Sequence, residues 1–211
     1  MIWEKTPDGL ISVKIKISGL LGGHSGSDIH LQRASAGKLM GRILRQTAKT
    51  FYFRLAGING GLMDNAITRE CEAVICLPKE DIEEFADMCS QLERIFNSEY
   101  RESEKMIEIS AEICESADRV MTVKAANDVI YAINLIPSGV QRVSLSMNGL
   151  VETSNNLGII RTTEDNVELV SAVRSSIATV KYDILEKMAM IAELIGGNFY
   201  IKSQYPGWEY R

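Results

Sequence analysis

The residues whose types could do chemistry are gathered in one glycine-rich stretch, residues 19–30, which reads GLLGGHSGSDIH. Both histidines of the chain, His24 and His30, lie in it, and Ser27 and Asp28 lie between them. Glycine permits backbone angles that other residues avoid, and it lets another molecule approach the main chain closely. The stretch therefore predicts a loop that presents His24, with Asp28 as the N-cap of a following helix.

The chemistry open to this loop is limited. Two histidines with no acidic neighbour except Asp28 do not make the three- or four-ligand cluster of a metal site. Ser25 adjoins His24, but neighbours in a loop rarely hold the geometry of a catalytic triad. A glycine loop that opens a helix can bind an anion, although this one lacks the Lys-Ser/Thr ending of a nucleotide loop. A plain glycine turn with a solvated histidine is the remaining alternative.

Other hydrogen-bond donors favour a role for the loop in binding an anion or an oxyanion. Asn65 follows a second glycine-rich stretch, residues 57–61, and the chain also contains arginines on predicted strands. An imidazole, an amide and a guanidinium together suit an oxyanion that is formed by groups outside the cluster.

Composition excludes several classes of function. The 211 residues carry a net charge of −5, which gives no electrostatic case for nucleic acid or for anionic lipid as a partner. No apolar run is long enough to span a membrane. The four cysteines form no CxxC pair and are expected to be buried free thiols, which favours a reducing, cytoplasmic location. They are Cys71, Cys76, Cys89 and Cys114.

Periodicity in the first half predicts the order strand, helix, strand, strand, helix, strand, which is ferredoxin-like. Apolar and polar residues alternate over residues 10–18, which indicates a strand with one packed and one solvated face. A helix with an acidic first turn is expected to open after Pro78. The other expected elements are a helix over residues 29–48, strands over 51–55, 70–77 and 106–113, and a strand break at 57–61.

The second half resembles the first but lacks an obvious first strand. Its expected elements are a helix capped by Thr122, strand material over 140–153 and 157–162 with interruptions at 148–149 and 155–156, a strand over 167–175, a helix over 179–195 and a last strand over 199–204. The chain is therefore predicted to be an α+β fold of two ferredoxin-like halves (βαββαβ-type), which form a largely antiparallel sheet with helices on one face. The expected division is a linker over 1–9, the first half over 10–115, the second half over 116–204 and a linker over 205–211.

The chain also resembles a known family. Residues 19–33, GLLGGHSGSDIHLQR, are similar to the signature of aminoacyl-histidine dipeptidases, which are carnosinase-like enzymes (peptidase D) in a clan of two-zinc metallopeptidases. Residues 60–70, 151–158 and 205–208 resemble three further blocks of that family, in the same order. In that family a lid domain is inserted into a catalytic domain that holds both metal ions, and the resemblance covers the lid alone.

The resemblance implies roles for individual residues. His24 matches the lid histidine that stabilises the oxyanion of the attacked peptide bond, and Asn65 matches an asparagine that binds substrate. Arg174 resembles the arginine that binds the C-terminal carboxylate, with Arg161 as the competing candidate. His30 is expected to be structural. Thr68 and Ser35 depart from the family pattern, at positions where proline and asparagine are usual, and we expect them to affect the scaffold rather than the donors.

The implied parent protein is a cytoplasmic dipeptidase for Xaa-His substrates such as β-alanyl-histidine, with two zinc or other divalent ions. Its metal ligands are expected in the missing catalytic domain and none in this chain, which should be inactive alone. A doubled lid would supply in one chain what dimeric relatives take from a neighbour, although a homodimer is also possible. The alternatives are a ferredoxin-like regulatory domain that binds an anion at residues 22–27, and a pure dimerisation module.

Overall fold

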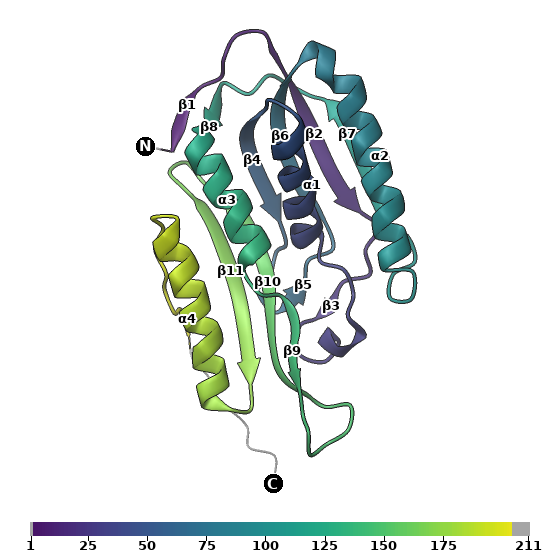
Figure 1. Ribbon diagram of the computed structural model, residues 1–211, viewed down its shortest axis with the longest axis vertical. Coiled ribbons are helices and arrows are strands. Elements are labelled where there is room, and N and C mark those ends of the chain that lie inside the picture. The colour runs from purple at the N-terminus through teal and green to yellow at the C-terminus, as the bar shows by residue number, and fades with distance from the viewer. Residues whose placement is uncertain (1, 204–211) are drawn as a thin grey trace.

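The computed structural model describes residues 2–203, in which four helices lie on one face of a largely antiparallel sheet (Figure 1). In chain order the elements are β1 (Trp3–Lys5), β2 (Leu10–Ser18), β3 (Gly23–His24), η1 (Ile29–Leu31), α1 (Ala36–Thr50), β4 (Arg54–Gly60), β5 (Ala66–Ile67), β6 (Cys71–Pro78), η2 (Lys79–Asp81), α2 (Ile82–Glu99), β7 (Glu108–Ile113), β8 (Arg119–Met121), α3 (Val123–Leu135), β9 (Gly139–Val143), β10 (Val151–Thr162), β11 (Val167–Ser175) and α4 (Ala178–Leu194). The predicted α+β class is confirmed.

The first half has the ferredoxin-like strand order. Its elements run β2-α1-β4-β6-α2-β7 along the chain, and its strands lie side by side in the order β4-β6-β2-β7. The alternation in β2 turns Val13, Ile15 and Ile17 toward the helices, where each is at most 1% exposed. Burial of each such side chain contributes about 1.5–3 kcal/mol, so this strand is fixed with its polar residues on the helix-free face.

The second half continues the same sheet. The strands β10 and β11 form a long hairpin, β9 pairs with the start of β10, and β10 pairs with β4 at Ile160 and Gly60. Figure 1 shows α4 lying along β11 at the edge of the sheet. Residues 199–203 form no strand, so the predicted last strand is wrong over that range, and Gln204 and the predicted linker 205–211 lie outside the described residues.

The helix predicted over residues 29–48 begins at Ala36 instead. Residues Ile29–Leu31 form only a 3-10 turn, which ends because Gln32 adopts the left-handed conformation, with φ 52°. The Asp28 side chain makes no capping hydrogen bond, because its Oδ2 accepts from the backbone N–H of His24 at 2.8 Å. The loop before α1 is therefore longer than expected.

Two predicted interruptions of strands are also wrong. The strand β4 runs through Gly57 to Gly60, because a register shift between Leu55 and Gly57 absorbs the irregularity. The strand β10 continues through residues 155–156, whose asparagine side chains are buried and hydrogen-bonded rather than forming a turn.

Other expectations hold closely. The strand over 167–175 has the predicted bounds, and the Thr122 side chain accepts from the Ala125 N–H at 3.2 Å as a cap of α3. All four cysteines are free, three of them buried and Cys114 half-buried. Trp3–Lys5, inside the predicted linker, pair with β8. The boundary predicted between residues 115 and 116 falls between β7 and β8 and stays a prediction. Within residues 2–203, no helix combines the length and apolarity needed to cross a membrane.

Candidate functional site

His24 and Asn65 lie on neighbouring segments of a two-stranded ribbon. His24 in β3 pairs with Ala66 in β5, and the backbone N–H of Ser25 donates to the carbonyl oxygen of Asn65 at 2.8 Å. Figure 1 places this ribbon toward the end of the molecule at which β11 finishes. The first half of the chain thus supplies two of the predicted donors side by side.

The His24 ring is held in one tautomer by its own loop. Its Nδ1 accepts from the backbone N–H groups of Gly26 at 3.2 Å and Ser27 at 3.1 Å. A backbone N–H can only donate, so Nδ1 carries no proton and the neutral ring carries its proton on Nε2. Because the residue is exposed, the Nε2–H is available to a group outside the loop.

The Asp28 carboxylate also stabilises this loop, through hydrogen bonds at both of its oxygens. Its Oδ2 accepts from the His24 backbone N–H at 2.8 Å, and Ser27 donates to its Oδ1 at 3.3 Å. The His24 backbone hydrogen bond, helped by Ser27 and the charge of Arg33, holds the pKa of this carboxyl below its usual value. The carboxylate therefore stays ionised and keeps the loop closed at neutral pH.

Arg174 reaches this loop from the second half of the chain. A Cβ added at Gly26 would lie 3.0 Å from His24 Cε1 and 3.3 Å from Arg174 Cζ, so the imidazole and the guanidinium meet at the same point. Among residues 2–203, no carboxylate lies at ion-pair distance from Arg174. The competing candidate, Arg161, is paired with Glu168 at 2.5 Å toward the far end of the β10–β11 hairpin. The structure thus brings Arg174 to His24, and not Arg161.

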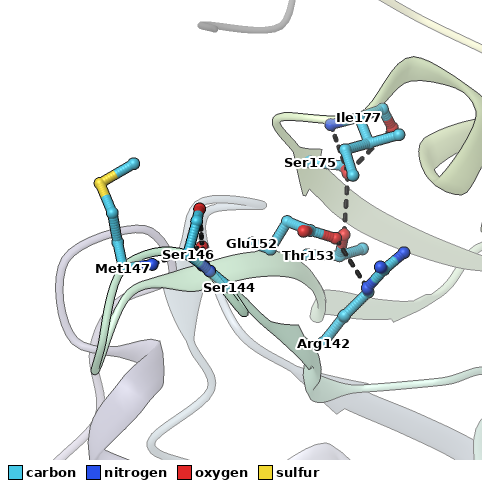
Figure 2. A network of polar contacts seen from close by, with 8 residues as sticks. All are labelled: Arg142, Ser144, Ser146, Met147, Glu152, Thr153, Ser175 and Ile177. Carbon is cyan, nitrogen blue, oxygen red and sulfur yellow. Dashed lines mark hydrogen bonds and ion pairs between the residues drawn. The ribbon is translucent and has the colours of Figure 1, made fainter. Parts of the chain in front are cut away.

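The residue after Arg174 is anchored by a network at the end of the hairpin. The Ser175 hydroxyl lies 2.8 Å from the Thr153 hydroxyl, donates to the Ile177 carbonyl at 3.0 Å and accepts from the Ile177 N–H at 3.1 Å. Figure 2 shows Ser175 between these two partners, with the Arg142–Glu152 ion pair beside them at 3.0 Å. These contacts fix the turn into α4 and with it the backbone that carries Arg174.

Comparison with known proteins identifies a domain in the first half of the chain. Residues 15–104 match the family model described as the peptidase dimerisation domain. This part of the chain is such a domain. The whole chain is 32% identical, over 98% of its length, to the cytosol non-specific dipeptidase of Escherichia coli (strain K12). It superposes on the crystal structure of aminoacylhistidine dipeptidase from Vibrio alginolyticus with a TM-score of 0.95 and 33% identity over 99% of its length.

The chain spans 42% and 43% of the lengths of these two relatives. The resemblance to aminoacyl-histidine dipeptidases is therefore confirmed, and it is a resemblance to one part of them. Within residues 2–203, no group of three or more His, Cys, Asp or Glu side chains is placed to hold a metal ion. The candidate site residues His24, Asn65 and Arg174 can donate hydrogen bonds, so they fit an anion better than a cation.

Two residues that support the site were missed in the sequence. Glu104, in the charged segment between the helix after Pro78 and the strand predicted over 106–113, is 8% exposed, and its carboxylate accepts from the N–H groups of Leu21 at 2.8 Å and Ala34 at 3.0 Å. It therefore ties the start of the glycine-rich stretch to the segment that precedes α1. Asn156, placed at a predicted strand interruption, binds the segment that carries Asn65. The signal available for Asn156 was a run of five polar residues, 152–156, between two apolar stretches of strand character.

The remaining predicted residues lie as follows. His30 is exposed on η1. Thr68 is buried, and its hydroxyl lies within hydrogen-bond distance of the carbonyls of Leu157 at 3.2 Å and Gly158 at 3.1 Å, so it joins the two halves of the chain. Ser35 precedes α1 as its N-cap without a side-chain capping bond.

Proposed function

We propose that this chain is the lid domain of a cytoplasmic, metal-dependent dipeptidase that cleaves Xaa-His substrates such as β-alanyl-histidine. Its part is to supply His24, Asn65 and Arg174 to a reaction centre in another domain. The observation that carries the proposal is the meeting of the His24 ring and the Arg174 guanidinium at Gly26. The dipeptidase names of the relatives with about one-third identity support the substrate class.

His24 stabilises the oxyanion that forms when the peptide carbonyl is attacked. Its Nε2–H is the free donor, since Nδ1 is occupied by the backbone N–H groups of Gly26 and Ser27. Removal of one oxyanion donor typically costs about 2.7–4 kcal/mol of transition-state stabilisation, or about 10²–10³ in kcat. The fixed tautomer also spares the ring any proton rearrangement before it donates.

Arg174 binds the C-terminal carboxylate of the substrate, and Asn65 donates from its side-chain amide to the substrate backbone. A guanidinium can bind a carboxylate through two parallel hydrogen bonds, which orients the substrate as well as holding it. Because Arg174 lies beside His24, the carboxylate sits close to the attacked carbonyl. A short distance between these two groups favours dipeptides over longer peptides.

The two zinc or other divalent ions that the resemblance implies would be held outside this chain, since residues 2–203 bring no ligand cluster together. Such ions would supply the attacking hydroxide, and the chain alone is expected to be inactive. The chain contributes donors and covers the substrate, as closing lids do. The family description also favours a homodimer of the parent protein.

The assignment of Arg174 is tested by the C-terminal charge of the substrate. In the parent dipeptidase, hydrolysis of β-alanyl-histidine is compared with hydrolysis of its C-terminal amide. Arg174→Ala is expected to abolish the preference for the free carboxylate, mainly through KM, whereas the control Arg161→Ala keeps that preference. A preference that survives Arg174→Ala and is lost in Arg161→Ala would reverse the assignment.

A further inference from the structure

The strand β10 contains a buried asparagine whose side chain faces the first half of the chain. Asn156 is 2% exposed, and its Nδ2 donates to the carbonyl oxygens of Asp64 and Ala66, each at 2.8 Å. These two carbonyls belong to the residues on either side of Asn65. Both protons of the side-chain amide are thus used to hold the backbone around one proposed substrate-binding residue.

Two further contacts show that the backbone near Asn65 has no free space. The Asn65 carbonyl accepts from the Ser25 N–H at 2.8 Å. A Cβ added at Gly158 would lie 2.5 Å from the Asp64 carbonyl oxygen, so the segment rests directly on β10 next to the register shift between Leu157 and Ile159. These contacts hold the backbone that carries Asn65 in place, although this segment is not part of the main sheet.

The same strand pairs with the strand that carries Arg174. In the β10–β11 hairpin, Asn156 lies opposite Ala172 and Ser154 lies opposite Arg174, so these residues share one face of the sheet. One side chain of the second half therefore joins the Asn65 segment of the first half to the immediate neighbourhood of Arg174.

We propose that Asn156 is a positioning residue that sets the place of Asn65 relative to Arg174. It touches no substrate; it acts through the backbone of residues 64–66. The relevance of Asn156 to catalysis rests on the proposed function, whereas its effect on the segment that carries Asn65 can be measured on the chain alone. Loss of the amide would leave two carbonyls without their donor inside the protein, and the segment would open locally.

The test compares two neighbouring asparagines that are buried to the same extent. Asn155 is 0% exposed and donates to the Pro137 carbonyl at 2.6 Å, away from the Asn65 segment. In Asn156→Ser, amide hydrogen exchange at Ser25 is expected to accelerate by about tenfold or more, and the Asn65 side-chain resonances should shift. In the control Asn155→Ser, thermal stability falls but Ser25 exchange stays as in the unchanged chain.

Equal exchange at Ser25 in the two variants, whether both fast or both slow, would overturn the proposal. If Asn156→Ser does not fold, the unchanged chain provides the measurement. Both side-chain amide protons of Asn156 should then exchange far more slowly than those of the exposed Asn148, with nuclear Overhauser contacts to residues 64 and 66. Exchange as fast as at Asn148 would refute the role. Neither readout depends on dipeptidase activity, so failure here is distinct from failure of the proposed function.

Discussion

The imidazole of His24 and the guanidinium of Arg174 approach the same side of Gly26, where an added Cβ would lie 3.0 Å from His24 Cε1 and 3.3 Å from Arg174 Cζ, although the two groups come from different halves of the chain. The contact needs a residue without a side chain between them, and it needs a sheet that runs through both halves. Each feature can be tested by substitution.

Gly26→Ala is expected to push the His24 ring away from Arg174. The new methyl carbon would lie 3.0 Å from Cε1 and 3.2 Å from Nδ1 of the ring, which is closer than ordinary packing allows. The 15N resonances of the His24 ring should then change from the pattern of a proton fixed on Nε2 to that of a mixture of tautomers. In Gly57→Ala, where the nearest atom is 3.7 Å away, the ring should be unaffected, and an unchanged ring in Gly26→Ala would contradict the geometry.

Glu104→Gln is expected to destabilise the loop that carries His24. The variant places an uncharged amide against the N–H groups of Leu21 and Ala34, and loss of one charged acceptor at such a site costs about 1–3 kcal/mol. The free energy of unfolding in urea measures the effect. Glu102→Gln, at an exposed carboxylate paired with Arg101, should change it by no more than about 0.5 kcal/mol. An equal loss of unfolding free energy in the two variants would contradict the role of Glu104 in holding the loop.

Lys38 joins α1 to the end of α3. Its Nζ donates to the carbonyls of Ile133, Asn134 and Ile136 at 2.5, 2.9 and 2.8 Å, and burial lowers its pKa to about 8. Between about pH 8 and the unfolded value of 10.5, the unfolded chain binds more protons than the folded chain. This group therefore makes stability rise with pH in that window, by about 2–3 kcal/mol in total.

The measurement is the free energy of unfolding between pH 7.5 and 10.5. The rise should be present in the unchanged chain and in the control Lys49→Met, at an exposed lysine of α1, and absent in Lys38→Met. At pH 7.5 the Lys38→Met variant should also lose the link to the end of α3, seen as faster hydrogen exchange there. An identical pH dependence in all three proteins would mean that Lys38 keeps the same proton in the folded and unfolded chains.

Local patterns in the sequence were sufficient for much of the fold. The alternation in residues 10–18 defines a strand with the observed bounds, the strand over 167–175 also has its predicted bounds, and Thr122 marks the start of α3. Asp28 was misleading because an aspartate can bond to a nearby backbone N–H in a loop as well as cap a helix, and here it takes the His24 N–H.

The support of the site could not be predicted, because it depends on contacts between distant parts of the chain. Glu104 binds residues 83 and 70 positions away, and Asn156 binds residues 92 and 90 positions away. No periodicity or spacing records such pairs. The family resemblance named His24, Asn65 and Arg174 but left Arg161 as an alternative, and the two arginines are separated by the fold, which brings Arg174 to Gly26 and pairs Arg161 with Glu168.

The central claim, that the His24 Nε2–H stabilises an oxyanion, is tested most directly by His24→Ala in the parent dipeptidase, with His30→Ala as the control at the other exposed histidine. Hydrolysis of β-alanyl-histidine and bound metal are measured on the same samples. The account predicts that kcat falls by about 10²–10³ in His24→Ala with metal content unchanged, and that His30→Ala stays near the starting activity. Full activity in His24→Ala would contradict it.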